Sequence, residues 1–322
     1  MAVTDRIAAD YRVLREGCGL LDRSERGKLA LTGEEAAEFL NGQVSNDVLA
    51  LEPGRGCYAA LLTPKGKMLA DLRILAVPES DDHELWLDTE RSALQGLFDS
   101  LRRHLVGFRT QLHKRTLQQG LLSLIGPEAP GLLQAPPPEP EHASRRATVA
   151  DRPVLLIRTD VGIDVVCDAA DLGPVSSALR DAGAVDVSED AVECVRIEEG
   201  RPRYGLDLDH SVIPQEAGLN DRAVSFTKGC YVGQETVARL YYRGKPNRHL
   251  RGLLLSGPAN RGDELRLGDR EVGRLGSLAL SPALGPIGLA IVRREADTGA
   301  VLEVGRGAIA AKVADLPLVS PD

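Results

Sequence analysis

The sequence predicts an α+β protein of two or three domains, the last of them a small all-β barrel. Residues 68–106 and residues 154–182 share one order of elements, two strands followed by a helix. Strands and helices grouped in this way are typical of α+β folds. Beyond residue 247, short strands alternate with turns rich in Gly, Pro and Asp, a spacing typical of a barrel. A chain of 322 residues also exceeds the size that one hydrophobic core usually supports.

The N-terminal third begins with a helix over residues 4–17, where Ile7, Tyr11 and Leu14 form an apolar stripe. Hairpin-turn chemistry in Thr63-Pro-Lys-Gly-Lys67 joins two apolar strands. We expect Trp86, the single tryptophan, to be packed in the core. In chain order the expected elements are a strand at 27–33, a helix at 34–40, a turn at Asn41-Gly42, strands at 57–63, 68–77 and 84–88, and a helix at 90–106.

The middle of the chain begins with a proline-rich stretch, residues 132–144, which we expect to be an exposed loop because proline removes backbone donors and fixes φ. Residues 201–227 show almost no periodicity, and long irregular segments in compact proteins are usually functional. The other elements expected are strands at 154–159 and 162–167, helices at 172–182 and 189–199, and barrel strands at 250–256, 263–267, 270–280, 287–292, 300–304 and 307–314.

Composition narrows the class of protein. The 47 Asp and Glu against 39 Lys and Arg give a net charge of -8, which disfavours nucleic acid and anionic membranes as partners. The first residues carry charges where a secretory signal needs an apolar core, and no apolar run approaches the ~20 residues that span a bilayer. We therefore expect a cytoplasmic protein. Its five cysteines lie too far apart for a disulfide framework, a zinc site or a cluster motif, so no metal site is predicted.

Residues 226–239 are the most informative stretch of the chain. Gly229 and Gly233 flank Cys230 and allow backbone conformations that side chains block. Gln234-Glu235 has the composition of a helix start, with its acid in the first turn. A thiol just ahead of a helix N-terminus and beside Lys228 is expected to have a lowered pKa. The alternative is that Cys230 is a small buried hydrophobic residue.

The string Lys228-Gly-Cys-Tyr231-Val-Gly-Gln-Glu235 resembles the K-G-C-Y-x-G-Q-E signature of the YgfZ family of folate-binding proteins, relatives of the glycine cleavage T-protein, an aminomethyltransferase. Three further segments resemble family motifs: Arg196 to Gly200, Tyr204 to Asp207 and Ile213 to Leu219. The resemblance implies bound tetrahydrofolate, or a one-carbon derivative, and a role in assembly or repair of iron–sulfur clusters. Its implied partners are iron–sulfur enzymes or cluster-assembly proteins.

The same resemblance implies an aminomethyltransferase-like cloverleaf of three domains around a central channel. Two of the domains would be mixed α/β domains of ferredoxin-like or Greek-key type, and the third the C-terminal barrel. We expect a discontinuous folate-binding domain at residues 1–50 and 145–245, a second α+β domain at 51–144 and the barrel at 246–322.

Candidate folate contacts follow from the family motifs. Glu198 in R-x-E-x-G matches the pterin-contacting glutamate, and Asp88 at a strand end is a second candidate. Tyr204 and Asp71 are further candidate cofactor-binding residues. For the anionic glutamyl tail of folate, arginine offers bidentate pairing, and the cations close in sequence are Arg239, Arg243 and Lys245. Cys230, with Lys228, is the candidate for chemistry.

One departure from the T-protein bears on activity. The T-protein has a paired Asp-Asp that contains its catalytic acid, and the corresponding residues here are Ala70-Asp71. Since alanine cannot exchange a proton, the sequence favours a folate-binding accessory protein for iron–sulfur clusters, with Cys230 beside the folate channel. The alternative is a folate-dependent aminomethyltransferase or demethylase. A binding module that acts on nucleic acid is a third possibility, which the net charge disfavours.

Overall fold

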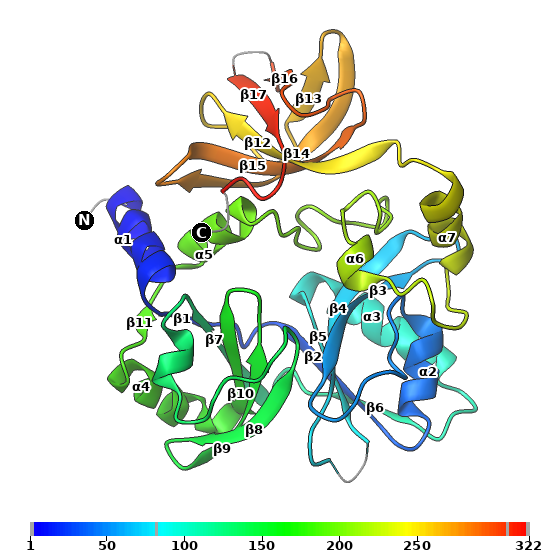
Figure 1. The fold of residues 1–322 in the computed structure, drawn as a ribbon, viewed down its shortest axis with the longest axis vertical. Helices are drawn as coiled ribbons and strands as arrows, with labels where there is room; N and C mark the ends of the chain where they lie inside the picture. The colour runs from blue at the N-terminus through cyan, green and yellow to red at the C-terminus, as the bar shows by residue number, and fades with distance from the viewer. Residues whose placement is uncertain (1–2, 81–82, 307–308, 320–322) are drawn as a thin grey trace. The chain divides into compact units, whose positions relative to one another are not determined.

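The computed structural model describes residues 3–80, 83–306 and 309–319, and the chain forms two compact units. The two-sheet unit comprises Arg12–Val187 and Asn220–Gln234, and the barrel unit comprises Met1–Tyr11, Ser188–Leu219 and Glu235–Asp322. Helices and largely antiparallel sheets make up the fold, which is α+β with a C-terminal barrel, as predicted (Figure 1). Within these described ranges, no helix is long and apolar enough to cross a membrane.

The two-sheet unit is built on a five-stranded and a six-stranded sheet. The order of the first is β3-β4-β5-β2-β6: β2 (Gly27–Thr32), β3 (Gly56–Leu62), β4 (Met68–Ala76), β5 (Leu85–Thr89) and β6 (Gln111–Lys114). The order of the second is β11-β1-β7-β10-β9-β8: β1 (Gly19–Asp22), β7 (Gln119–Ile125), β8 (Ser144–Val149), β9 (Arg152–Arg158), β10 (Gly162–Asp168) and β11 (Val185–Asp186). Its helical segments are α2 (Ala36–Gln43), α3 (Arg91–His104), η1 (Ala129–Leu132), η2 (Ala169–Asp171), α4 (Leu172–Asp181) and α6 (Asn220–Ala223).

The two sheets pack against each other through apolar side chains. Trp86 and Leu75 from the five-stranded sheet form one buried cluster with Leu121, Ile157 and Val166 from the six-stranded sheet. Trp86 is 1% exposed and donates its indole N–H to Gln119 at 2.8 Å, so the prediction of a packed tryptophan is confirmed.

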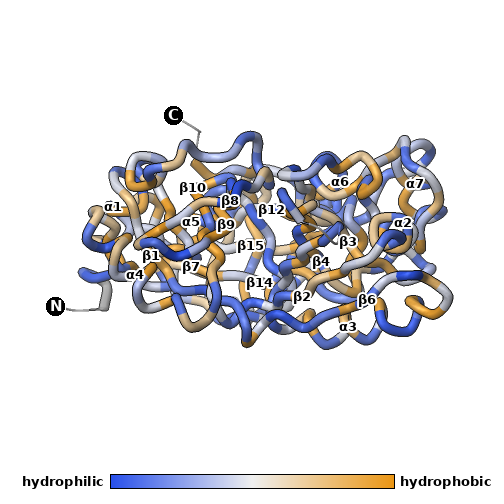
Figure 2. Tube along the Cα trace, turned by 90° about the horizontal axis from the view of Figure 1, so that it is seen from below, coloured by the Kyte–Doolittle hydropathy of each residue, from blue (hydrophilic) through white to orange (hydrophobic). Residues whose placement is uncertain are grey.

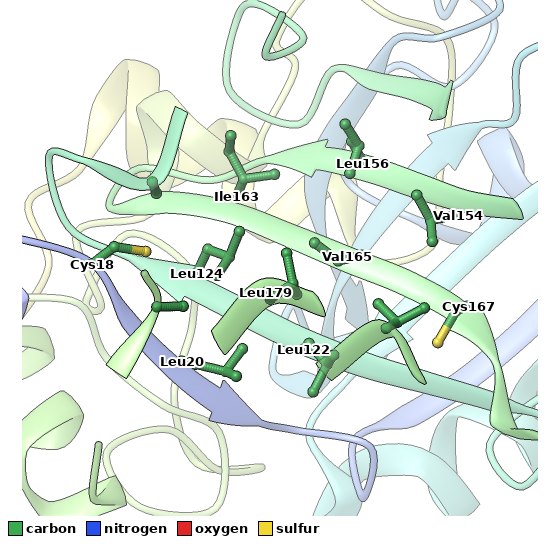
Figure 3. Packing of buried hydrophobic residues seen from close by; sticks show 13 residues of the cluster. Cys18, Leu20, Leu122, Leu124, Val154, Leu156, Ile163, Val165, Cys167 and Leu179 are labelled. Atoms are coloured by element: carbon green, nitrogen blue, oxygen red, sulfur yellow. The ribbon is translucent and has the colours of Figure 1, made fainter. Parts of the chain in front are cut away.

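The other face of the six-stranded sheet is covered by α4. Val175 and Leu179 of this helix join a second buried cluster with Leu122 and Val165 (Figure 3). Strands β7 and β10 are therefore buried on both faces, which explains why each reads as a nearly continuous hydrophobic run along the trace (Figure 2).

The barrel unit closes six strands in the order β12-β15-β14-β13-β16-β17 around its own apolar core. Helix α5 (Glu189–Glu198) packs on β14 and β15. The strands are β12 (Arg248–Leu255), β13 (Glu264–Leu267), β14 (Arg270–Ser281), β15 (Gly285–Arg293), β16 (Val301–Val304) and β17 (Ile309–Ala314). Helices α1 (Val3–Glu16) and α7 (Gln234–Arg243) each run from one unit into the other along the chain.

The structure corrects some predicted elements. The turn expected at Asn41-Gly42 is wrong, because α2 continues to Gln43 and the Asn41 side chain instead accepts a hydrogen bond from Val48 N at 3.0 Å. Five strands were not predicted: β1, β6, β7, β8 and β11. Of these, β7 is a short apolar run without alternation, and β8 is an edge strand with polar residues. Residues 307–308 of the last predicted strand lie outside the described residues, and the division into three domains stays a prediction.

Replacing Gly162 tests how closely strands β7 and β10 approach each other in the six-stranded sheet. A Cβ atom at this position would lie 1.9 Å from the Leu124 carbonyl oxygen on β7, whereas a Cβ at Gly173 in α4 would meet no atom within 4 Å. We expect Gly162→Ala to lower the free energy of unfolding by about 2 kcal/mol or more, because the strands must separate. Gly173→Ala is the matched control and should be neutral or slightly stabilising. Urea denaturation followed by Trp86 fluorescence measures both, and equal midpoints for the two variants would contradict the packing described.

Candidate functional site

The loop that carries Cys230 lies in the two-sheet unit, just before α7. Helix α7 begins at Gln234, as predicted, and the Cys230 side chain is exposed. The alternative that Cys230 is a buried hydrophobic residue is therefore wrong. The acid Glu235 occupies the first turn of α7.

Lys228 fastens this loop to the end of α2. Its ammonium group donates to the backbone carbonyls of Asn41, Val44 and Asn46 at 2.6, 2.9 and 2.8 Å. The side chain is only 9% exposed, and burial lowers the pKa of Lys228 to about 8. The sequence suggests that this ammonium acts on Cys230, but in the structure its protons are used by three carbonyls. Its role is to hold the loop in place.

Gly229 and Gly233 differ in how closely other atoms surround them. Gly233 has a φ of +87°, and a Cβ there would lie 2.6 Å from the Thr63 carbonyl oxygen in the β3–β4 turn. Gly229 has open space around its Cα, so close packing does not explain it. Tyr231 is buried, with a pKa raised to about 12 by burial, and its carbonyl accepts from Gln234 N at 3.3 Å.

A second group of polar residues lies on the face of the five-stranded sheet opposite the side that buries Ala70. Tyr58 on β3 donates its hydroxyl to Asp71 on β4 at 2.5 Å. Burial raises the pKa of Asp71 to about 6 and raises the pKa of Tyr58 as well. A carboxyl group with such a pKa can both give and take a proton near neutral pH.

Asp88, a predicted pterin contact, is fully buried in an ion-pair network. Arg26 donates to one carboxylate oxygen at 2.8 and 2.5 Å, and Arg73 donates to the other at 2.6 Å. These two guanidinium groups hold the pKa of Asp88 at about 2 in spite of burial. Arg73 also pairs with Asp164 on β10 at 2.7 Å, and Ser123 donates to Asp164 at 2.6 Å. The network joins the two sheets, and both oxygens of Asp88 are occupied by protein donors.

Two residues beside Tyr58 were not predicted. The imidazole ring of His142 lies near-parallel to the Tyr58 ring, with centroids 6.4 Å apart, and the Arg222 guanidinium carbon lies 5.6 Å from the Tyr58 centroid. Arg222 also pairs with Glu141 at 2.6 Å. Asn46 connects this group to Lys228. Its backbone carbonyl accepts from the Lys228 ammonium, and its side-chain amide donates to the Tyr58 carbonyl at 2.8 Å. No local motif marks these residues, since the fold brings them together from distant segments.

Glu198 lies in the barrel unit and is 0% exposed. Its carboxylate accepts from the Tyr11 hydroxyl at 2.9 Å, from the Ser281 hydroxyl and from the Cys194 thiol at 3.6 Å. A contact between Glu198 and a pterin stays a prediction.

The other motif residues of the barrel unit stabilise the irregular segment after α5. Asp207 accepts from Arg196 at 3.1 Å and from the Ser277 backbone N–H at 2.7 Å, which ties the segment to β14. Tyr204 is half-buried and forms an isolated parallel β-bridge with Leu208. The predicted tail-binding cations, Arg239, Arg243 and Lys245, are exposed.

The barrel unit also contains a groove of about 540 Å³ between this segment and β14 and β15. Asp207, Arg248, Arg274 and Ala290 are among its lining residues. None of the predicted site residues lines this groove, so it gives no support to the predicted site.

Comparisons with known proteins agree with the fold. The family described as GCVT N-terminal domain matches residues 1–228, and the family described as glycine cleavage T-protein C-terminal barrel domain matches residues 248–320. The aminomethyltransferase of Streptomyces avermitilis is 30% identical over 302 residues, covering 88% of this chain and 80% of its own. The aminomethyltransferase of Chlorobium phaeovibrioides is 28% identical over 337 residues, covering 98% of this chain and 91% of its own. The crystal structure of glycine cleavage system aminomethyltransferase T from Bartonella henselae superposes with a TM-score of 0.86 at 23% identity, covering 97% and 89% of the two chains.

Replacing Lys228 tests whether its hydrogen bonds to the carbonyls of Asn41, Val44 and Asn46 stabilise the fold. We expect Lys228→Met to lower the free energy of unfolding of the two-sheet unit by about 3 kcal/mol, because three backbone carbonyls, two of them in buried hydrogen bonds, lose their donor. The exposed Lys65, replaced by Met, is the matched control. Urea denaturation followed by Trp86 fluorescence gives both values. A Lys228→Met protein as stable as the control variant would show that these three hydrogen bonds do not stabilise the fold.

The raised pKa of Asp71 gives a pH dependence with a definite sign. Because the folded pKa of about 6 exceeds the ordinary 3.8, protonated Asp71 stabilises the fold below pH 4, and this contribution is lost as pH rises through 6. Asp71→Asn mimics the protonated form, so its stability advantage over the parent should grow to about 3 kcal/mol between pH 4 and pH 7.5. Denaturation at several pH values measures the difference. The exposed Asp181→Asn is the control, and a pH-independent difference for Asp71→Asn would refute the shift.

Proposed function

Because the chain belongs to the glycine cleavage T-protein family, we propose that it binds tetrahydrofolate and transfers a one-carbon unit between an amine and this folate. Asp71 is the proposed proton-transferring residue. The observation that carries the proposal is the geometry of Asp71, a buried carboxyl group with a pKa of about 6 that receives a hydrogen bond from Tyr58 at 2.5 Å. Tetrahydrofolate would supply the nitrogen that accepts or releases the carbon unit.

The Ala70-Asp71 pair is compatible with this activity. Consecutive residues of a strand point to opposite faces of the sheet. Ala70 is 0% exposed and lies on the apolar face with Leu72 and Ile74, whereas Asp71 lies on the polar face with Tyr58 and Arg73. Alanine at position 70 thus removes no acid from the polar face.

In the proposed reaction, protonated Asp71 donates its proton to the amine nitrogen while the bond from that nitrogen to the transferred carbon breaks. The carbon passes to the folate nitrogen, and the Asp71 carboxylate takes up the proton that this nitrogen loses. A carboxyl group with a pKa near the working pH is suited to this general acid step and to the reverse step as a base. Tyr58 keeps the carboxyl group in one orientation through its hydroxyl, and the Arg26–Asp88–Arg73 network keeps the neighbouring charges paired.

The remaining contacts are proposals of the same kind. Glu198 would accept N–H groups of the pterin, in place of the Cys194 thiol, which at 3.6 Å is its weakest donor. Arg239, Arg243 and Lys245 would bind the glutamyl carboxylates, since all three are exposed cations. Tyr204 would lie on the pterin side. Asp88 would act through Arg73 and Arg26 rather than by direct contact.

A second candidate function is favoured by the exposed Cys230 in a loop that Lys228 holds in place. In this alternative the chain is a folate-binding accessory protein of YgfZ type that supports assembly or repair of iron–sulfur clusters. Cys230 would then provide the chemistry, and iron–sulfur enzymes or cluster-assembly proteins would be the partners.

One experiment separates the two candidates. The purified protein is incubated with tetrahydrofolate and aminomethyl donors, whose carbon already has the oxidation state of the product, and methylenetetrahydrofolate is measured. We expect product from the parent protein, a loss of rate of about 100-fold or more in Asp71→Asn, and little change in Cys230→Ser.

A different outcome would favour the second candidate, the accessory protein for iron–sulfur clusters. No product would form with any donor, and a strain carrying Cys230→Ser would lose iron–sulfur enzyme activity while one carrying Asp71→Asn would keep it. Calorimetric titration with tetrahydrofolate shows whether the folate is bound in either case.

A further inference from the structure

His142 lies on the loop before β8, in the two-sheet unit, next to the proposed site. Its ring is inclined by 28° to the Tyr58 ring, and the hydroxyl of that same tyrosine bonds Asp71. One aromatic side chain therefore contacts both the imidazole ring and the proposed acid. Neither a motif nor a neighbouring residue in the sequence points to this histidine.

The backbone around His142 is held firmly. Its N–H donates to the Arg158 carbonyl at 2.9 Å, and its φ of +68° lies in the left-handed region, which side chains adopt only when their surroundings impose it. Gly56 at the start of β3 makes room for the loop, since a Cβ there would lie 2.5 Å from the His142 carbonyl oxygen. The imidazole is therefore placed by the fold.

The charges around the ring determine which nitrogen carries the proton. Burial lowers the pKa of His142 to about 4, so the ring is neutral at pH 7 and has one donor and one acceptor nitrogen. Nε2 lies 3.5 Å from a Glu141 carboxylate oxygen, which can only accept, and Arg222 holds that oxygen at 2.6 Å. We therefore assign the proton to Nε2 and the acceptor role to Nδ1.

Nδ1 of His142 is enclosed and, within the part of the chain that the structure describes, has no hydrogen-bond partner. An enclosed acceptor without a donor costs about 1–3 kcal/mol relative to one that is paired. Folded proteins seldom leave such an atom unpaired unless another molecule supplies the donor.

We infer that His142 Nδ1 accepts a hydrogen bond from an N–H group of a planar heterocyclic ligand bound beside Tyr58 and Asp71. The inference rests on the proposed function and deepens it, because it assigns a residue that reads the ligand's donor pattern. A reduced pterin has the required chemistry, with a flat ring, an amino group and ring N–H groups. The ligand would contact the Tyr58 ring through its face and His142 through an edge.

Two variants of His142 test the inference. His142→Phe keeps an aromatic ring beside Tyr58 and removes the acceptor, whereas His142→Asn keeps an acceptor and suits a left-handed backbone. Binding of tetrahydrofolate is measured by calorimetric titration, and stability by thermal melting. We expect His142→Phe to bind about tenfold more weakly or worse while melting at the same or a higher temperature, because an unpaired polar atom has been removed. His142→Asn should bind within about threefold of the parent.

The results distinguish this inference from the proposed function. A parent that binds tetrahydrofolate, together with a His142→Phe variant that binds equally well, overturns the inference and leaves the proposed function standing. Equal losses in both variants also overturn it, because they indicate a structural role. A parent that does not bind tetrahydrofolate overturns both.

A measurement on the parent protein does not depend on how the variants fold. Imidazole ¹⁵N NMR follows the unprotonated nitrogen of His142, assigned by its absence in His142→Asn or from through-bond correlations. Its resonance should move upfield when tetrahydrofolate binds, as expected for a nitrogen that gains a hydrogen bond. An unchanged resonance in the presence of bound folate overturns the inference.

Discussion

The ion pairs of Asp88 with Arg26 and Arg73 are the interaction on which the two-sheet unit depends. A fully buried carboxylate is stable only when its charge is matched, and here two guanidinium groups match it and lower its pKa to about 2. Arg73 reaches from β4 to Asp164 on β10. The network therefore fixes how the two sheets pack and which polar groups lie between them.

The same face shows how environment separates two carboxyl groups. Asp71 lies two residues from Arg73 on β4, yet its pKa is raised to about 6, because burial dominates and the side chain that donates to it, Tyr58, is a neutral phenol. Asp88 is held ionised by cations, and Asp71 is left able to change its protonation state. Paired carboxyl groups with opposite shifts are a recurring way to separate a structural charge from an exchangeable proton.

How far the sequence could predict this arrangement depends on the range of the interactions. The helix start at Gln234, the packed Trp86 and the C-terminal barrel follow from local patterns, and the structure has them. The roles of Lys228 and His142 do not, because the partners of each come from segments about 180 and 84 residues away, respectively. Burial decides whether a lysine acts on a thiol or on three carbonyls, and burial is set by the tertiary fold.

The Ala70-Asp71 pair shows why a motif is best read together with strand geometry. A missing carboxylate in a sequence motif counts as lost chemistry only if that side chain would have faced the reacting groups. On β4 the faces alternate, so position 70 joins Leu72 in the apolar layer, and position 71 joins the polar layer with Tyr58. A charged residue at position 70 would need its own partners in that apolar layer. Alanine there is therefore a packing choice, and the capacity for proton transfer resides in Asp71.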